Sequence, residues 1–200
     1  MRIISGTSKG RKLARPKSMA VRPTSDRVKE SIFNILGAEV EGRDVLDLFA
    51  GTGSLGIEAL SRGAKRALFV EKGRQAVRLI QRNVGECGFS ERSEILPREV
   101  HRALGILIQR GESFDLILMD PPYERGLIEK TLRKLNASSI YPEDALLVIQ
   151  HDRREPLPNN LGGWVLSRQR KIGDTLVSFL ARIPLEPGST QHEGIPNEKD

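Results

Sequence analysis

Hydrophobic and polar residues follow a regular alternation along most of this chain. From residue 43 onward, short apolar runs are separated by longer stretches whose apolar positions recur at helical spacing. This pattern is typical of βαβ units, in which each strand is followed by a helix and joins a parallel sheet. We predict five strands at residues 44–49, 66–71, 93–96, 114–119 and 145–150. We predict helices between them at residues 54–61, 73–87, 100–109 and 126–135, each about long enough for a crossover connection.

The pattern changes towards the C-terminus. Residues 164–171 and 175–181 are both predicted strands, and only Ile172, Gly173 and Asp174 separate them. So short a connection predicts a hairpin, that is, an antiparallel pair. The chain is therefore expected to be an α/β protein with a mostly parallel seven-stranded sheet that ends in an antiparallel hairpin.

One more helix is predicted before the first strand. Thr24 or Ser25 can cap its N-terminus, and Asp26 lies in its first turn. Apolar side chains recur at helical spacing along it, at Val28, Ile32, Ile35 and Leu36. We expect this helix to pack on the main domain.

The length of 200 residues fits a single domain with short additions. We expect a basic extension with its helix at 1–42, the main domain at 43–185 and a disordered tail at 186–200, which is polar and rich in Gly and Pro. The single Cys87 excludes an internal disulfide framework and favours a reducing compartment. Because no stretch approaches the ~20 apolar residues of a membrane span and the start lacks the apolar region of a signal peptide, we expect a cytoplasmic protein without membrane contact.

The net charge of +6 is distributed unevenly. Residues 1–30 contain nine Lys or Arg against two acidic residues, a net charge of +7, so the other 170 residues sum to −1. Such a cluster suggests a polyanion as partner, because clustered cations neutralise phosphates and release counterions. The alternative is a solvated basic arm that keeps the protein soluble. The candidate RNA-binding residues are Arg11, Lys12, Arg15, Lys17, Arg22 and Arg27.

A glycine-rich turn directly follows the first predicted strand. Gly51, Gly53 and Gly56 satisfy the pattern G-x-G-x-x-G, in which the backbone turns tightly and approaches a ligand closely. Glu71 lies about 20 residues further on, where an acidic side chain meets a ribose in nucleotide-binding folds. With Thr52 inside the turn, these residues form a candidate cofactor site. The alternative is a tight turn without a ligand beside an exposed carboxylate.

Asp47 bears on which cofactor such a turn would hold. Its carboxylate is expected near the end of the first strand, where it would repel the pyrophosphate of a dinucleotide but attract a cationic sulfonium ligand. The sequence therefore favours S-adenosylmethionine over a dinucleotide.

The fourth predicted strand runs directly into the motif Asp120-Pro121-Pro122-Tyr123. The motif thus lies at the carboxyl end of a strand, where open α/β sheets bind ligands. Each proline forces the residue before it into extended geometry, so the motif projects rigidly. We expect the Asp120 carboxylate and the Pro121 carbonyl each to accept a hydrogen bond from an exocyclic amine, and Tyr123 to stack on the base. The alternative is that the two prolines only end the strand and that Tyr123 packs in the core.

With both motifs in place, the sequence resembles the bacterial 16S ribosomal RNA guanine-N2 methyltransferase family. The resemblance extends to about Ile183 and is most specific in the stretch Arg22-Pro23-Thr24. The other matching stretches are 1–6 with Lys9-Gly10-Arg11 and Leu13, 25–30 with Phe33-Asn34-Ile35-Leu36, 47–56, 120–123, and Lys171 with Gly173-Asp174-Thr175.

The resemblance implies a Rossmann-like class I methyltransferase fold with S-adenosylmethionine as donor and a guanine in 16S ribosomal RNA as target. It also implies that the segment containing Arg22 and Thr24 helps to cover the cofactor and contacts RNA. The family usually has an Asp near the cofactor adenine after the third strand, whereas this sequence has Glu99, a longer carboxylate that can still reach the adenine amine.

Several alternatives remain open from sequence. The chain could be a non-catalytic RNA-binding factor of ribosome assembly, although an intact Asp120 motif argues against this, or a DNA or RNA adenine-N6 methyltransferase. Few residues remain, however, for a separate domain that reads DNA bases. We expect a monomer, with naked RNA and a small-subunit particle both open as substrate. No metal site is predicted, because His101, His151 and His192 lack ligand spacing and are expected at the surface.

Overall fold

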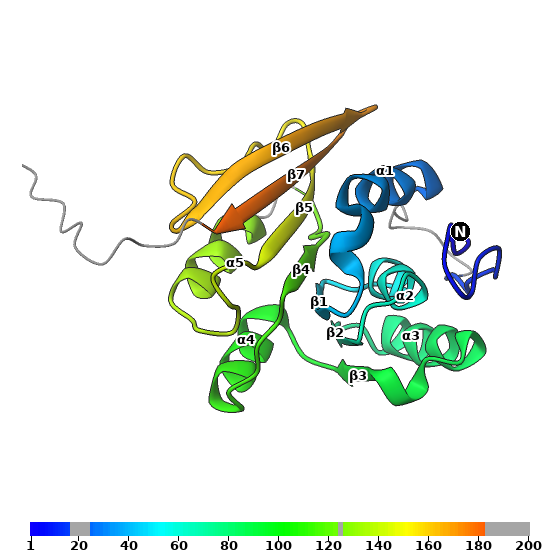
Figure 1. Ribbon diagram of the computed structural model, residues 1–200. Helices are drawn as coiled ribbons and strands as arrows, with labels where there is room; N and C mark the ends of the chain where they lie inside the picture. The colour runs from blue at the N-terminus through cyan, green and yellow to red at the C-terminus, as the bar shows by residue number, and fades with distance from the viewer. Residues whose placement is uncertain (17–24, 124–125, 183–200) are drawn as a thin grey trace, which may run out of the picture.

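The computed structural model describes residues 1–16, 25–123 and 126–182, and its centre is one sheet of seven strands (Figure 1). The strands are β1 (Asp44–Leu48), β2 (Arg66–Val70), β3 (Ser93–Leu96), β4 (Leu116–Met119), β5 (Leu146–Asp152), β6 (Trp164–Ile172) and β7 (Thr175–Arg182). Their order across the sheet is β3-β2-β1-β4-β5-β7-β6. β1 to β5 pair in parallel, whereas β7 is antiparallel to both β5 and β6. The predicted α/β class, strand number and final hairpin are confirmed.

In the described part of the chain, five α-helices cover the two faces of the sheet (Figure 1). They are α1 (Asp26–Leu36), α2 (Ser54–Ser61), α3 (Arg74–Cys87), α4 (Val100–Gln109) and α5 (Leu127–Asn136). One buried cluster joins α1, α2 and α3 to the sheet, and a second joins α4 and α5 to its opposite face. β1, β2, β4 and β5 are buried along almost their whole length, and this is why they are largely apolar in the sequence. The edge strand β3 is only partly buried and contains Ser93 and Glu94.

The strand order reverses between β1 and β4, which are direct neighbours. Leu48 pairs with Met119 and, on the other side, with Val70. The residues that follow these three strands therefore leave the same edge of the sheet side by side. Ligands bind at such a reversal point in open α/β sheets, because the connections on either side diverge and leave a crevice.

Element boundaries differ from the predictions by one or two residues. β4 begins at Leu116 rather than at residue 114, and α3 and α5 each begin one residue after a glycine, Gly73 and Gly126. Two short 3-10 helices, η1 (Gly37–Val40) and η2 (Ser90–Arg92), were not predicted. None of the helices in the described part of the chain is long and apolar enough to cross a membrane. The predicted disordered tail lies outside the described residues.

The first residues of the chain pack against α2 and α3 (Figure 1). Arg2 and Lys12 form an isolated antiparallel bridge, while Ile3 and Leu13 are buried in the core. Gly6 has a φ of +81° and lies so close to Ser61 that a Cβ would collide with the carbonyl oxygen of Ser61. We call residues 1–14 the N-terminal segment. The alternative that it is a solvated arm does not fit, because its backbone is bound to the domain.

A buried ion pair holds this segment in place. The side chains of Lys29 and Glu58 are both fully buried, with 3.6 Å between Nζ and Oε2. Glu58 also accepts hydrogen bonds from the backbone N–H groups of Ile4 (2.8 Å) and Ser5 (3.0 Å). The pKa of Lys29 is lowered by burial, and Glu58 acts in the opposite direction. The N-terminal segment thus depends on a carboxylate in α2, the helix that starts at the glycine-rich turn.

Candidate functional site

The glycine-rich turn occupies the reversal point, between the end of β1 and the start of α2. Phe49, Gly51 and Gly53 all have positive φ values, of 60°, 57° and 78°. The positive φ of Phe49 is unfavourable for a residue with a side chain, and it ends β1 one residue earlier than predicted. The N–H of Gly53 donates to the carbonyl of Ala50 (2.7 Å), which closes the turn. The chain therefore reverses direction at the edge of the sheet. This leaves glycine backbone without side chains where a nucleoside cofactor can make close contact.

Glu71 connects this turn to the next loop. Its Oε2 accepts a hydrogen bond from the N–H of Gly51 (2.9 Å), and its Oε1 accepts one from the N–H of Gly73 (2.7 Å). The side chain is partly exposed. A carboxylate has about four lone-pair positions, so Glu71 can accept from ribose hydroxyls while it keeps both backbone contacts. The spacing predicted the position of Glu71, but not its part in holding the turn.

Asp47 lies beneath the turn and is 1% exposed. Its Oδ2 accepts a hydrogen bond from the N–H of Gly56 (2.9 Å). Burial raises the pKa of Asp47 to about 7; the bond from Gly56 opposes this rise, and the nearby carboxylates of Asp120 and Glu71 add to it. Three acidic side chains therefore converge here, which suits a cationic ligand.

Gly56 explains why the carboxylate and the helix can come so close. A Cβ at this position would overlap the ring of Phe69 and lie 3.1 Å from Oδ2 of Asp47. The third glycine of the motif is thus required by packing of α2 on β2 rather than by ligand contact.

The Asp120-Pro121-Pro122-Tyr123 motif follows β4, next to the turn. Pro121 is buried, Pro122 is exposed, and Asp120 and Tyr123 are partly exposed. The motif therefore lies at the predicted edge of the sheet, with its carboxylate close enough to affect the pKa of Asp47.

Gln150 on β5 is a neighbour of the motif that the sequence did not indicate. It is 4% exposed, and its Nε2 lies 3.5 Å from the hydroxyl of Tyr123. Its Oε1 is buried without a hydrogen-bond partner among the described residues. A buried, unsatisfied acceptor is rare, and at this place it is available to a polar group of a ligand. A signal existed in the sequence, since Gln150 is the first polar residue after the apolar run of β5 from Leu146 to Ile149.

A second unpredicted residue, Asn83 on α3, links the turn to the N-terminal segment. Its buried amide accepts from the N–H of Ala14 (2.7 Å) and donates to the carbonyls of Ala14 (3.2 Å) and Thr52 (3.0 Å). The hydroxyl of Thr52 also lies 3.6 Å from the sulfur of Met1. The predicted cofactor residue Thr52 is therefore in contact with Asn83 through its carbonyl and with Met1 through its hydroxyl, which connects the turn to the N-terminal segment.

The remaining predicted residues lie apart from this centre or outside the described residues. Glu99 caps α4 and accepts from the N–H of Arg102 (3.2 Å), beyond the end of β3. Ser25, rather than Thr24, caps α1, with a bond from the N–H of Val28 (3.2 Å). Four predicted RNA-binding residues are exposed on the described surface: Arg11, Lys12, Arg15 and Arg27. Lys17, Arg22 and Thr24 fall outside the described residues.

The expectation for the histidines is wrong at one position. His151 on β5 is fully buried, and its two ring nitrogens lie 2.9 Å from the carbonyl oxygen of Glu155 and 2.9 Å from the hydroxyl of Ser178. Burial lowers the pKa of His151, so the ring is held neutral as part of the core. His101 is exposed as expected, and His192 lies outside the described residues. Within the described ranges, no group of three or more His, Cys, Asp or Glu side chains could hold a metal ion.

The fold defines a Rossmann-like class I methyltransferase, with a glycine-rich turn after β1 and the Asp120-Pro121-Pro122-Tyr123 motif after β4. Residues 1–181 match the family model described as Conserved hypothetical protein 95, and the chain belongs to this family.

Named relatives align over most of the chain. The chain is 38% identical over 179 residues to "Putative rRNA methyltransferase YlbH" of Bacillus subtilis, covering 90% of this chain and 97% of that protein. It is 34% identical over 182 residues to "Ribosomal RNA small subunit methyltransferase D" of Escherichia coli K12, covering 91% and 90%. The solved structure "Putative methyltransferase yhhF from Escherichia coli" superimposes with a TM-score of 0.77 at 32% identity, covering 91% and 97%.

Proposed function

We propose that this protein transfers a methyl group from S-adenosylmethionine to the exocyclic N2 amine of a guanine in 16S ribosomal RNA. The observation that carries the proposal is the position of Asp120 and its motif beside the glycine-rich turn and Glu71, at one edge of the sheet. A donor bound by the turn and an acceptor bound by the motif would meet there. The names of the full-length relatives support ribosomal RNA of the small subunit as the acceptor.

The cofactor half of the site fits S-adenosylmethionine by shape and charge. Glu71 is placed to accept hydrogen bonds from the ribose hydroxyls, and the turn from Phe49 to Gly53 gives close backbone contact. Burial raises the pKa of Asp47 beneath the turn to about 7, and a bound cationic donor favours its ionised form. When bound, the donor supplies a methyl group on a positively charged sulfur, and the amine nitrogen attacks this methyl as the carbon–sulfur bond breaks.

The acceptor half prepares the amine. The lone pair of an exocyclic amine is delocalised into the base, so the free amine is a poor nucleophile. Asp120 accepts a hydrogen bond from one amine proton and the Pro121 carbonyl accepts the other, so that the nitrogen becomes pyramidal and its lone pair is free to react. After methyl transfer the nitrogen carries a surplus proton, which passes to Asp120 or to water. Tyr123 stacks on the target base, a contact worth about 1–3 kcal/mol.

The N-terminal cations are proposed to hold the RNA. Arg11, Lys12 and Arg15 are exposed on a segment whose backbone is anchored by Glu58 and Asn83. Their charges are thereby held at a fixed place near the cofactor turn. Charged side chains on an ordered segment lose less entropy when they bind phosphates than those on a free arm.

The test is methylation in vitro with purified protein, labelled S-adenosylmethionine and three acceptors: 16S ribosomal RNA transcript, small-subunit particles and duplex DNA. Nucleoside mass spectrometry should detect N2-methylguanosine in the RNA or the particle. N6-methyladenine in RNA or DNA would overturn the guanine assignment. A protein that fails to bind S-adenosylmethionine in a calorimetric titration would instead be an assembly factor without catalysis.

A further inference from the structure

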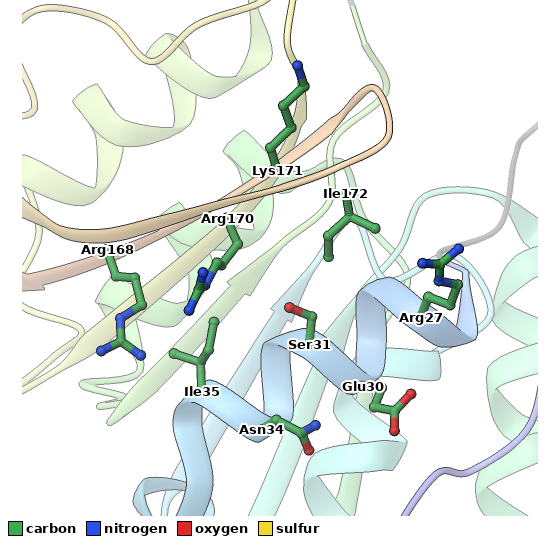
Figure 2. Close-up of a pocket in the computed structure, with 9 residues that line it drawn as sticks. All are labelled: Arg27, Glu30, Ser31, Asn34, Ile35, Arg168, Arg170, Lys171 and Ile172. Carbon is green, nitrogen blue, oxygen red and sulfur yellow. The ribbon is translucent and has the colours of Figure 1, made fainter.

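A groove of about 600 Å³ runs between helix α1 and strand β6, which is an edge strand of the sheet (Figure 2). Neither element carries a residue of the cofactor turn or of the Asp120 motif. Arg27 and Glu30 line the groove from α1, and Arg168, Arg170 and Lys171 line it from β6.

The groove carries an excess of positive charge. Among the described residues that line it, four are cationic and Glu30 is the single acidic one. All four cationic residues are exposed, and none forms an ion pair with a carboxylate within the described part of the chain. Several exposed arginines on α3, at the end of α4 and on α5, by contrast, pair with a carboxylate nearby. The groove thus holds positive charge that the protein itself does not neutralise.

The side chains are arranged to face a ligand in the groove. Arg168, Arg170 and Ile172 project from β6 towards α1, whereas Lys171 projects from the other face of the strand (Figure 2). This alternation is the one that a β-strand imposes. Two guanidinium groups therefore face α1 at successive positions along the strand. Guanidinium groups suit phosphates, because each offers a planar fork of N–H donors.

Strand pairing places the groove close to the acceptor motif. Arg170 pairs with Val177, and Val177 pairs with Gln150, the residue that contacts the Tyr123 hydroxyl. Arg170 and Gln150 thus lie in one row across the sheet, two strand spacings or about 10 Å apart. β6 is parallel to β5, so its carboxyl end lies at the same edge of the sheet as the Asp120 motif. The groove opens where nucleotides beside a bound target base would pass.

We propose that the groove between α1 and β6 binds the phosphate backbone of the RNA next to the target guanine. This inference rests on the proposed function and assigns a second anchoring surface to it, distinct from the N-terminal segment. RNA is favoured as the occupant because Arg168 and Arg170 have no carboxylate partner among the described residues. It is favoured also because Arg170 lies only about 10 Å from Gln150, beside the motif that is proposed to hold the target base. Although residues 31–200 have a negative net charge, Arg168, Arg170 and Lys171 concentrate positive charge locally on β6.

The test is equilibrium binding of 16S ribosomal RNA transcript across a salt series, with the double variant Arg168→Gln/Arg170→Gln. The matched control is Arg110→Gln/Arg133→Gln, which removes two exposed charges at the ends of α4 and α5, on the opposite edge of the sheet. Loss of two phosphate contacts should lower the magnitude of the slope of log affinity against log salt by about 1.4. If the wild-type and variant lines meet at 1 M salt, the variant binds RNA about 25-fold more weakly at 0.1 M salt. The control should leave both values unchanged.

Two results would overturn the inference. One is a salt slope in the groove variant that equals that of the wild type. The other is an equal loss in the groove variant and in the control, which would reflect net charge alone. Calorimetric titration with S-adenosylmethionine should give wild-type affinity in both variants and so shows that they are folded. The two proposals fail in different measurements. If the proposed function is wrong, the wild-type protein transfers no methyl group; if the groove proposal is wrong, the Arg168→Gln/Arg170→Gln variant binds RNA with the salt slope of the wild type or loses no more affinity than the control.

Discussion

The two halves of the site are built differently, although they lie side by side at one edge of the sheet. On the cofactor half, the polar groups of the turn already have partners inside the protein: Glu71 holds two backbone N–H groups, Asp47 holds a third, and Asn83 holds the carbonyl of Thr52. On the acceptor half, Pro122 and the cations of β6 are exposed, and the buried Oε1 of Gln150 has no partner among the described residues.

This difference suggests how the work is divided. The cofactor half is preorganised, so that a small donor binds without rearrangement of the turn. On the acceptor half, the cations of β6 and the Oε1 of Gln150 remain available for hydrogen bonds to a large polar ligand. Changes on the acceptor half should therefore impair turnover or RNA binding while the fold stays intact, whereas changes on the cofactor half should also affect stability or donor affinity.

The largest effect is expected on the acceptor half. Asp120→Ala should lower the rate of methyl transfer by about 10²–10⁴-fold, the range typical of a positioned acid–base group. Affinity for S-adenosylmethionine should stay within a few fold, because Asp120 addresses the amine. Single-turnover kinetics beside a donor titration measures both, with Glu143→Ala as control at an exposed carboxylate at the other end of the sheet. Near-normal turnover of the Asp120 variant would refute the mechanism.

The next effect concerns the anchoring of the N-terminal segment. Glu58→Gln should destabilise the protein by about 3 kcal/mol, because it leaves Lys29 buried without its counter-charge. The double variant Lys29→Met/Glu58→Gln should recover part of this loss, because it removes the uncompensated buried charge. Recovery is incomplete, since the single amide oxygen of glutamine can accept from only one of the N–H groups of Ile4 and Ser5, which bind different oxygens of Glu58. Denaturant unfolding gives both values. Equal stability of the single and the double variant would contradict this role of the pair.

A smaller effect is expected at Glu71. Glu71→Ala should weaken donor binding by about 1–3 kcal/mol, or about 5- to 150-fold, through loss of charge-assisted bonds to the ribose and of support for Gly51. Calorimetry measures the affinity, and Glu86→Ala on the outer surface of α3 serves as control. Unchanged affinity for the donor would instead support the alternative that the Glu71 carboxylate binds no ligand.

The smallest effect is a dependence on pH. Because the pKa of Asp47 is raised to about 7, the free protein holds this group protonated below that pH. A cationic donor favours the ionised form, so its affinity should fall as the pH drops below about 7, by at most about tenfold per unit. Asp47→Asn should flatten this dependence. An affinity that rises as the pH falls would contradict the electrostatic account.

The same group affects folding with a defined sign. In the unfolded chain Asp47 loses its proton near pH 4, whereas in the fold it keeps the proton until about pH 7. Its contribution to stability without donor is therefore largest at low pH and is lost as the pH rises through about 7. Thermal unfolding of Asp47→Asn should lack this component.

The sequence predicted features that depend on local patterns. The parallel strands β1, β2, β4 and β5 are largely apolar, and a glycine-rich turn and a Pro-Pro motif follow β1 and β4, so both Gly51 and Asp120 were placed at the correct edge of the sheet. Features that depend on distant packing were missed. Asn83 occupies a helical position where a polar residue suggests the surface, and its contacts with Ala14 and Thr52 explain its burial.

The errors have the same origin. His151 was expected at the surface because it is isolated and lacks metal-ligand spacing, but its partner Ser178 lies on β7, which pairs with β5. The groove between Arg27 and Arg170 joins two segments that are far apart in sequence, and a count of net charge over the whole chain conceals it. Charge must be mapped onto the fold before its partner can be inferred.

The central claim, methylation of guanine N2 in 16S ribosomal RNA, is tested most directly by nucleoside mass spectrometry of ribosomal RNA from cells that lack this gene. The account predicts that one N2-methylguanosine disappears from the small-subunit RNA, and that it returns with the wild-type gene but not with Asp120→Ala. An unchanged content of N2-methylguanosine in the deletion strain, or loss of a different modification, would contradict it.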